Sequence, residues 1–99
     1  MRMFRGDLLP DLQITCTDND APVDLTTATG IRVIGVTAGK VLFDRAVTGT
    51  ASGLVTMVWE TADTAAPGRV AVEVEVTWPG VRPQTFRPAQ VVDIVADYA

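Results

Sequence analysis

Glu73 and Glu75 form the pair of carboxylates in this 99-residue sequence that comes nearest to a catalytic pattern. Side chains two residues apart on a strand point to the same face, and a glycosidase needs two carboxylates roughly 5–10 Å apart. The residues around them alternate between polar and apolar types, and such alternation by itself places two acidic side chains on the wet face of a strand. We therefore interpret Glu73 and Glu75 as solvated surface residues and expect no catalytic pair.

Three aspartates, Asp18, Asp20 and Asp24, resemble the beginning of an oxygen-rich calcium loop. The EF-hand pattern requires a glycine at its sixth position and a glutamate at its twelfth. Counted from Asp18, those positions hold Val23 and Thr29, so the pattern fails. Aspartate and asparagine also favour turns, because their side chains hydrogen-bond to nearby backbone groups. We expect a turn here, no bound metal, and a protein that is indifferent to chelators.

The residue types that are rare in this chain exclude most familiar enzyme mechanisms. The chain contains no histidine, one cysteine (Cys16) and one serine (Ser52), so it cannot build a Ser-His-Asp triad, a Cys-His pair or a zinc site of Cys and His ligands. The glycines lie at predicted turns, and none belongs to a phosphate-binding loop between a strand and a helix. Cys16 alternates with apolar residues and is expected to be an inert buried thiol. We therefore expect neither catalysis nor a cofactor.

Charge and hydropathy narrow the range of partners. The formal net charge is −4, and an acidic protein has no basic field with which to attract nucleic acid or an anionic membrane. No apolar run approaches the ~18 residues that a membrane-spanning helix needs. We expect neither nucleic acid nor a membrane among the partners of this protein.

The composition favours β-strands. Fifteen Val, thirteen Thr and four Ile make 32 of the 99 residues β-branched, and such side chains fit a pleated, half-buried surface better than a helix. The clearest strand is predicted over residues 69–78, where every second residue from Val70 to Trp78 is apolar. The pairs Pro67-Gly68 and Pro79-Gly80 precede and follow this segment, and both favour turns.

Further strands follow at the spacing expected for a β-sandwich. They are predicted over residues 12–17, 31–37, 41–47, 54–59, 84–86 and 91–95. One helical turn is expected over residues 61–66, with Thr61 as its cap. Together these elements predict an all-β, immunoglobulin-like antiparallel β-sandwich of seven or eight strands. We expect one domain over residues 1–99, in which residues 1–8 form an N-terminal arm.

Short motifs spread along the chain add a resemblance to this prediction. An opening Gly6-Asp7 precedes the alternating segment 12–17 and the stretch Ala-Pro-Val-Asp-Leu-Thr-Thr-Ala-Thr at residues 21–29. The later pieces are Gly-Leu-Val-Thr at 53–56, Thr-Ala-Asp-Thr at 61–64 and Pro67-Gly68. In this combination the sequence resembles the immunoglobulin-like N-terminal domain of phage baseplate upper proteins and related small phage virion proteins. Thr27 stands where that family often has glycine, and the baseplate proteins continue into further domains where this chain ends at Ala99.

The resemblance implies a function without catalytic residues. We expect a non-enzymatic structural protein of a phage or phage-like particle, located in the virion as a tail or baseplate component or as a capsid decoration protein. Its expected partners are other virion proteins and further copies of itself, bound by protein–protein docking. The alternative is a carbohydrate-binding or adhesion module in which Trp59 or Trp78 stacks on a sugar, although both rings also suit a core.

Two predicted strands carry apolar residues on both faces. In segment 31–37, Ile31 and Val33 point to one side and Ile34 and Val36 to the other, and in segment 91–95, Val91 and Val95 oppose Val92 and Ile94. A two-layer sandwich buries one face of each sheet, so we expect one set to stay at the surface and mark a protein interface. The alternative is that residues 4–9 fold back over the outer face. The candidate interface residues are Ile31, Val33, Ile34, Val36, Val92 and Ile94.

Overall fold

The computed structural model describes residues 1–96, apart from the side chains of residues 87–89, so positions 97–99 of the predicted domain lie outside the described residues. Nine strands and one short 3-10 helix are formed in this part of the chain. In order, they are β1 (Arg2–Phe4), β2 (Leu12–Thr15), β3 (Thr17–Asp18), β4 (Ala21–Pro22), β5 (Gly30–Thr37), β6 (Lys40–Val47), β7 (Leu54–Met57), η1 (Thr61–Thr64), β8 (Gly68–Trp78) and β9 (Arg82–Val95).

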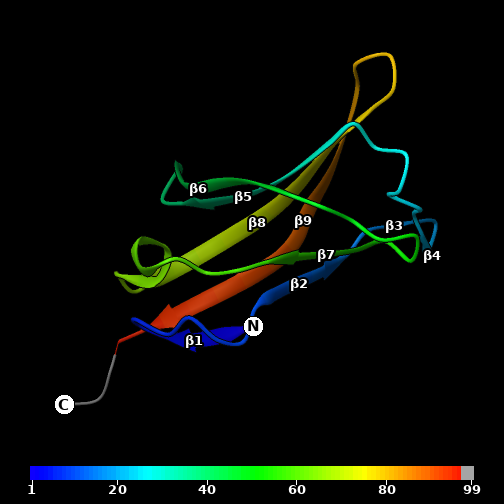
Figure 1. Cartoon of the computed structure of the whole chain (residues 1–99). Helices are drawn as coiled ribbons and strands as arrows, with labels where there is room; N and C mark the ends of the chain where they lie inside the picture. Colours follow the sequence, from blue (N-terminus) through cyan, green and yellow to red (C-terminus); the bar gives the residue numbers. More distant parts are fainter. Residues whose placement is uncertain (97–99) are drawn as a thin grey trace.

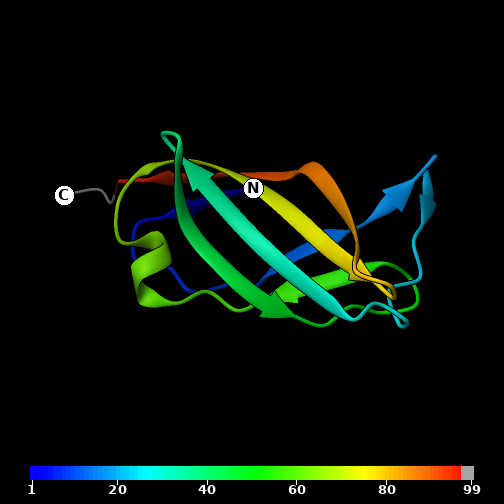
Figure 2. The same ribbon diagram turned by 90° about the horizontal axis from the view of Figure 1, so that it is seen from above.

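The strands form one large mixed sheet and two small sheets (Figure 1). The large sheet has the order β1-β9-β8-β5-β6, in which β1 runs parallel to β9 and every other pair is antiparallel. β2 pairs antiparallel with β7, and β3 with β4. Seen from above, the large sheet lies across β2 and β7, which form a second layer (Figure 2). The prediction of an all-β fold is confirmed, and its two layers are arranged like a sandwich.

The core lies between β2–β7 and the inner face of the large sheet. On β8, Val70, Val72, Val74 and Val76 are at most 1% exposed, as the alternation of that segment predicted. Burying one such side chain is worth about 1.5–3 kcal/mol, so β8 supplies a large share of the driving force for folding. The second layer covers these valines with Leu12, Ile14, Val55, Met57 and Trp59.

The two short strands predicted over 84–86 and 91–95 are one strand, β9, which pairs with β8 along most of its length. The pairing register shifts on β9 between Phe86, opposite Val74, and Gln90, opposite Val72. Residue 88 in this interval is proline, which has no backbone N–H to donate to a ladder. A bulge therefore lets a single long strand continue where the sequence pattern indicates an interruption.

The first residues of the chain belong to the sheet and do not form a separate arm. Arg2–Phe4 is the edge strand β1, and Met3 is buried opposite Ile94. Beyond it, the backbone N–H of Gly6 donates to the carbonyl of Thr64, and the indole Nε1–H of Trp59 donates to the carbonyl of Pro10. The segment after β1 thus crosses from the edge of the large sheet to the second layer, and it does not cover the outer face.

The predicted helical turn is present as η1, although its cap is Glu60 and not Thr61. The backbone N–H of Glu60 donates to the carboxylate of Asp63 over 2.8 Å, so the acidic side chain at the third helical position closes the turn. Within residues 1–96, no helix has the length and the apolar character that crossing a membrane requires.

Candidate functional site

The structure separates the six candidate interface residues into two groups. Ile31, Val33, Val92 and Ile94 are 0–5% exposed and belong to the core, so their assignment to an interface is wrong. Ile34 and Val36 lie on the opposite, outer face of β5 and are half-buried. The surroundings of Gly35 explain why Ile34 and Val36 point outward. A Cβ on Gly35 would lie 2.4 Å from the ring of Phe43, so this position on the inner face of β5 has no room for a side chain.

The structure also corrects the prediction for the last strand, β9. Val92 and Ile94 point inward, and Val91 and Val95 occupy the outer positions, where both are half-buried. Both faces of this segment are apolar, so alternation alone does not show which one meets the core. The register against β8 decides it, because Val70 and Val92 are opposite each other and both are buried.

The outer face of the large sheet carries an apolar row that runs across four strands. Val41, Val36, Ala71 and Val91 are successive cross-strand partners on β6, β5, β8 and β9. Directly opposed side chains of adjacent strands lie about 4.5–5.5 Å apart at Cβ, so the row is continuous. Val41 is 63% exposed, and Ile34 extends the row by one position along β5. In both views of the fold, β2 and β7 lie on the other side of this sheet (Figures 1 and 2).

Charged side chains border the apolar row on one side. The guanidinium of Arg32 donates from Nε to Asp44 over 2.9 Å and from Nη1 to Glu75 over 3.2 Å. The hydrogen bond from Arg32 lowers the pKa of the Asp44 carboxyl, and the same bond raises the pKa of Arg32. All three side chains are at least one-third exposed, so these ion pairs add little to stability.

The other side of the row ends in a second group of charges. Arg69 on β8 donates to Asp93 on β9 over 3.1 Å, and the two side chains are 75% and 46% exposed. Arg2 on β1 is opposite Asp93 in the register, and its guanidinium lies 5.9 Å from the centre of the Phe4 ring. Charged groups therefore border the apolar row on both of its sides along the strands.

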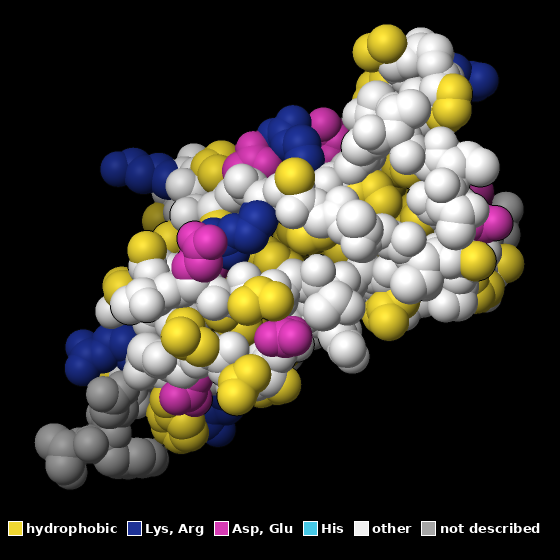
Figure 3. Space-filling model, in the orientation of Figure 1, with side chains coloured by type: hydrophobic (Ala, Val, Ile, Leu, Met, Phe, Trp, Pro, Cys, Tyr) yellow, Lys and Arg dark blue, Asp and Glu magenta, His cyan; other side chains and the backbone are white. Residues whose placement is uncertain are grey.

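A third charged cluster, centred on Arg45, closes one side of the sandwich. Arg45 points inward from β6 and donates to both carboxylate oxygens of Asp63, over 2.7 and 3.2 Å, and to Glu60 over 3.0 Å. Asp63 is 4% exposed at its side chain, and its hydrogen bond raises the pKa of Arg45. Arg45 and Glu60 also line a hollow together with Val47 and Met57. The space-filling view shows charged side chains next to hydrophobic ones on the face that it displays (Figure 3). The cluster ties β6 to η1, and sequence reasoning missed it.

The acidic residues that resembled a calcium loop form a turn. Asn19 and Asp20 both have positive φ angles, 51° and 63°, in the tight connection between β3 and β4. The carboxylate of Asp24 accepts hydrogen bonds from the backbone N–H and the hydroxyl of Thr26, which lower its pKa. Within residues 1–96, no group of three or more His, Cys, Asp or Glu side chains is placed to hold a metal ion. Cys16 is 1% exposed, and burial raises the pKa of its thiol.

The two tryptophans have different environments. Trp59 is 2% exposed and packs edge-to-face on Phe43, with ring centres 5.7 Å apart. It therefore presents no platform for a sugar. Trp78 is half-buried at the end of β8, where its indole N–H donates to Gln84 over 2.9 Å beside a shallow hollow that Arg82 also lines. Only Trp78 keeps part of its ring accessible.

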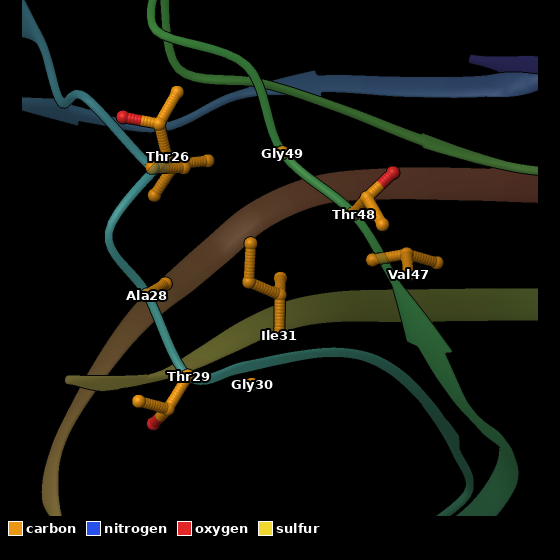
Figure 4. Close-up of a pocket in the computed structure, with 9 residues that line it drawn as sticks. Thr26, Ala28, Thr29, Gly30, Ile31, Val47, Thr48 and Gly49 are labelled. Carbon is orange, nitrogen blue, oxygen red and sulfur yellow. The ribbon is translucent and has the colours of Figure 1, made fainter. Parts of the chain in front are cut away.

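A second hollow opens at one end of the sandwich, between the segment before β5 and the segment after β6 (Figure 4). Ile31 points into it, and the close approach of Gly49 to Leu25 and Ile31 forms one wall. The hydroxyl of Thr29 already has a hydrogen-bond partner, since it donates to the carbonyl of Thr77 over 3.0 Å. The hollow thus exposes the end of the core and contains no charged group among its lining residues.

Compared with models of known protein families, with curated proteins and with solved structures, the chain shows no significant match.

Proposed function

We propose that this chain is a non-enzymatic structural module of a phage or phage-like particle, which docks other virion proteins through the outer face of its large sheet. Its place in the virion is a tail or baseplate component or a capsid decoration protein. The motif resemblance supports the kind of particle. The observation that carries the docking role is the apolar row of Val41, Val36, Ala71 and Val91 on that outer face.

We also propose that the fold is immunoglobulin-like. Variable-type immunoglobulin domains join the strands G, F, C and C′ in one sheet and oppose them with B and E, and β9, β8, β5, β6, β2 and β7 follow this order. The chain crosses between layers from β2 to β5, from β6 to β7 and from β7 to β8, as this topology requires. A single cysteine means that the disulfide of antibody domains is absent.

The docking role rests on the cost of exposed apolar surface. Monomeric proteins seldom keep contiguous apolar patches beyond a few hundred Å², and larger ones mark sites of association. Here five adjacent positions on four strands are apolar, although each could be polar without loss of the core. Val41 and Ala71 are exposed, and Ile34, Val36 and Val91 are half-buried.

The test uses particles purified from cells that carry the gene. We expect the wild-type chain to copurify with them and the variant Ile34→Lys with Val36→Glu to be lost from them. Both substitutions fall on the outer face, so circular dichroism and thermal unfolding should show a folded variant. Full occupancy of the variant in particles would contradict the docking face. Absence of the wild-type chain from particles would contradict the virion assignment.

The matched control places the same charges on the outer face of the second layer. Gln13 and Thr56 are opposite each other on β2 and β7, and both are exposed. Gln13→Lys with Thr56→Glu should therefore leave folding and particle binding unchanged. A loss of binding in this control would mean that added charge, and not its position, disturbs assembly.

A carbohydrate-binding module is the second candidate, and the position of Trp78 is the observation that favours it. Its half-buried ring lies beside Gln84 and Arg82, whose polar groups suit sugar hydroxyls. Glycan titration with tryptophan fluorescence tests this, because buried Trp59 remains as an internal reference. A saturable, sugar-specific change that Trp78→Phe abolishes would favour this candidate over docking.

A further inference from the structure

The outer face of β8 presents a positive, a small neutral and a negative residue in equal steps. Arg69, Ala71 and Glu73 point to the same side, with Val70 and Val72 pointing into the core between them. Successive outer positions on a strand are about 6.6–6.8 Å apart, so the two charges lie roughly 13 Å apart with Ala71 midway. Ala71 also belongs to the apolar row.

This arrangement is complementary to itself. If a second copy faces the sheet across a two-fold axis that passes Ala71 at right angles to β8, each Arg69 meets the Glu73 of the other copy, and the contact occurs twice. An axis parallel to the strands would instead place Arg69 against Arg69 and Glu73 against Glu73, which repel. Although Arg69 also pairs with Asp93 of its own copy, the positions of Arg69 and Glu73 favour the first of these two face-to-face orientations.

The apolar row lies along the selected axis. Val36, Ala71 and Val91 would each approach the same residue of the second copy, because an axis across the strands leaves every strand position in its place. Packed sheets lie about 10 Å apart, and the small side chain of Ala71 at the centre permits that approach. The charged groups on either side then form the rim of the contact, which is the usual anatomy of a protein interface.

The size of the face indicates a weak contact. Five strands at spacings of about 4.8 Å span roughly 19 Å, and the seven residues from Gly68 to Val74, centred on Ala71, span roughly 20 Å. The footprint is thus about 400 Å² on each copy, which lies below the standard size of stable interfaces and at the low end of weak or transient ones. A dimer of this size forms at high local concentration, as in a repeated array.

We infer that a second copy of this chain docks on the outer face of the large sheet, related by a two-fold axis through Ala71 and oriented by reciprocal pairs of Arg69 with Glu73. The inference rests on the proposed docking role of this face and specifies its partner.

Sedimentation velocity of the purified protein over a wide range of concentration tests this directly. We expect a reversible monomer–dimer equilibrium that is visible only at the high end of the concentration range and is weakened by added salt, because the pairs are exposed. Arg69→Glu and Glu73→Arg should each weaken the homodimer about tenfold or more, since each turns both attractive pairs into repulsive ones. Thermal unfolding of both variants should show that the monomer remains folded.

A mixing experiment separates the two-fold geometry from a merely structural effect. The Arg69→Glu variant and the Glu73→Arg variant carry complementary faces, so an equimolar mixture should dimerise although neither does so alone. The double variant Arg69→Glu with Glu73→Arg should regain homodimer formation, because reversing both charges restores every pair. The control Gln13→Lys with Thr56→Glu, on the other layer, should dimerise like the wild type.

The outcomes that overturn the inference differ from those that overturn the docking role. A wild type that stays monomeric at every concentration overturns self-association, and loss of the Ile34→Lys, Val36→Glu variant from particles would then still support docking to another protein. A wild-type dimer that neither charge reversal changes overturns the two-fold geometry. Failure of the complementary variants to associate on mixing overturns it as well.

Discussion

The outer faces of the two layers differ in composition, although both belong to strands with a buried inner face. On the second layer, Gln13, Thr15 and Thr56 are exposed and polar, and Leu54 is half-buried. On the large sheet, the apolar row and Ile34 occupy the corresponding outer positions. Because an isolated sandwich needs polar outer faces, the apolar row distinguishes the large sheet, and the proposed docking role depends on it.

The charged clusters on the two faces of the large sheet differ in burial. Arg32, on the outer face, pairs with two carboxylates while its side chain remains 47% exposed. Arg45, on the inner side, also pairs with two carboxylates, but one of them, Asp63, is almost fully buried. The outer cluster can exchange its partners for those of a docked protein, whereas the inner cluster cannot be opened without a large cost.

The largest expected effect concerns the division between inner and outer positions on β8. Val74→Asp should abolish folding, because an unpaired charge at a fully buried site costs several kcal/mol, comparable to the whole stability of a small domain. The neighbouring outer substitution Ala71→Asp should leave a folded protein. Thermal unfolding followed by circular dichroism measures both, and a well-folded Val74→Asp variant would show that the two faces are assigned incorrectly.

The next effect compares the two arginines. Arg45→Met leaves the buried carboxylate of Asp63 without its main partner and should cost about 2 kcal/mol, somewhat less than for a fully buried pair because Arg45 keeps some solvent contact. Arg32→Met removes an exposed pair and should cost much less, because exposed ion pairs contribute little to stability. Urea unfolding gives both values. Equal losses for the two variants would mean that the inner cluster is no more important to stability than the outer one.

A smaller effect on stability is expected when the outer face of the large sheet is made similar to that of the second layer. Val36→Thr with Val91→Thr keeps the β-branched shape and replaces apolar surface by hydroxyl groups. We expect a change in the free energy of unfolding below about 1 kcal/mol and a clear loss of self-association. Leu54→Thr on the second layer is the control and should leave self-association unchanged.

The smallest effect is a dependence on pH from the outer cluster. The pKa of Asp44 is lowered in the folded protein, so its pair with Arg32 stabilises the fold above the unfolded value of 3.8, and this contribution is lost as the pH falls through the lowered folded value. Because Asp44 is more than one-third exposed, we expect no more than about 0.5 kcal/mol. Urea unfolding between about pH 5 and pH 2 measures it, and Arg32→Gln should flatten that part of the profile.

Much of the fold could be predicted from local patterns. The alternation of β8, the hairpin turn at Asn19 and Asp20 and the single helical turn of η1 each depend on residues that are close in sequence. The edge strand β1 could not be predicted, because Arg2–Phe4 is too short to show a pattern and pairs with a strand about ninety residues away. The continuity of β9 also escaped prediction, since its bulge depends on the register against β8.

The candidate site shows the same limit. The sequence alone determined that segments 31–37 and 91–95 are apolar on both faces, that the chain lacks the residues of common catalytic and zinc sites, and that β8 has one wet face. Only the tertiary structure decided that Ile34, Val36 and Val91 are outside, while Ile31, Val33, Val92 and Ile94 are inside. The reason is physical: a strand with two apolar faces gains similar burial from either, so the neighbours, such as Phe43 over Gly35, determine which face enters the core.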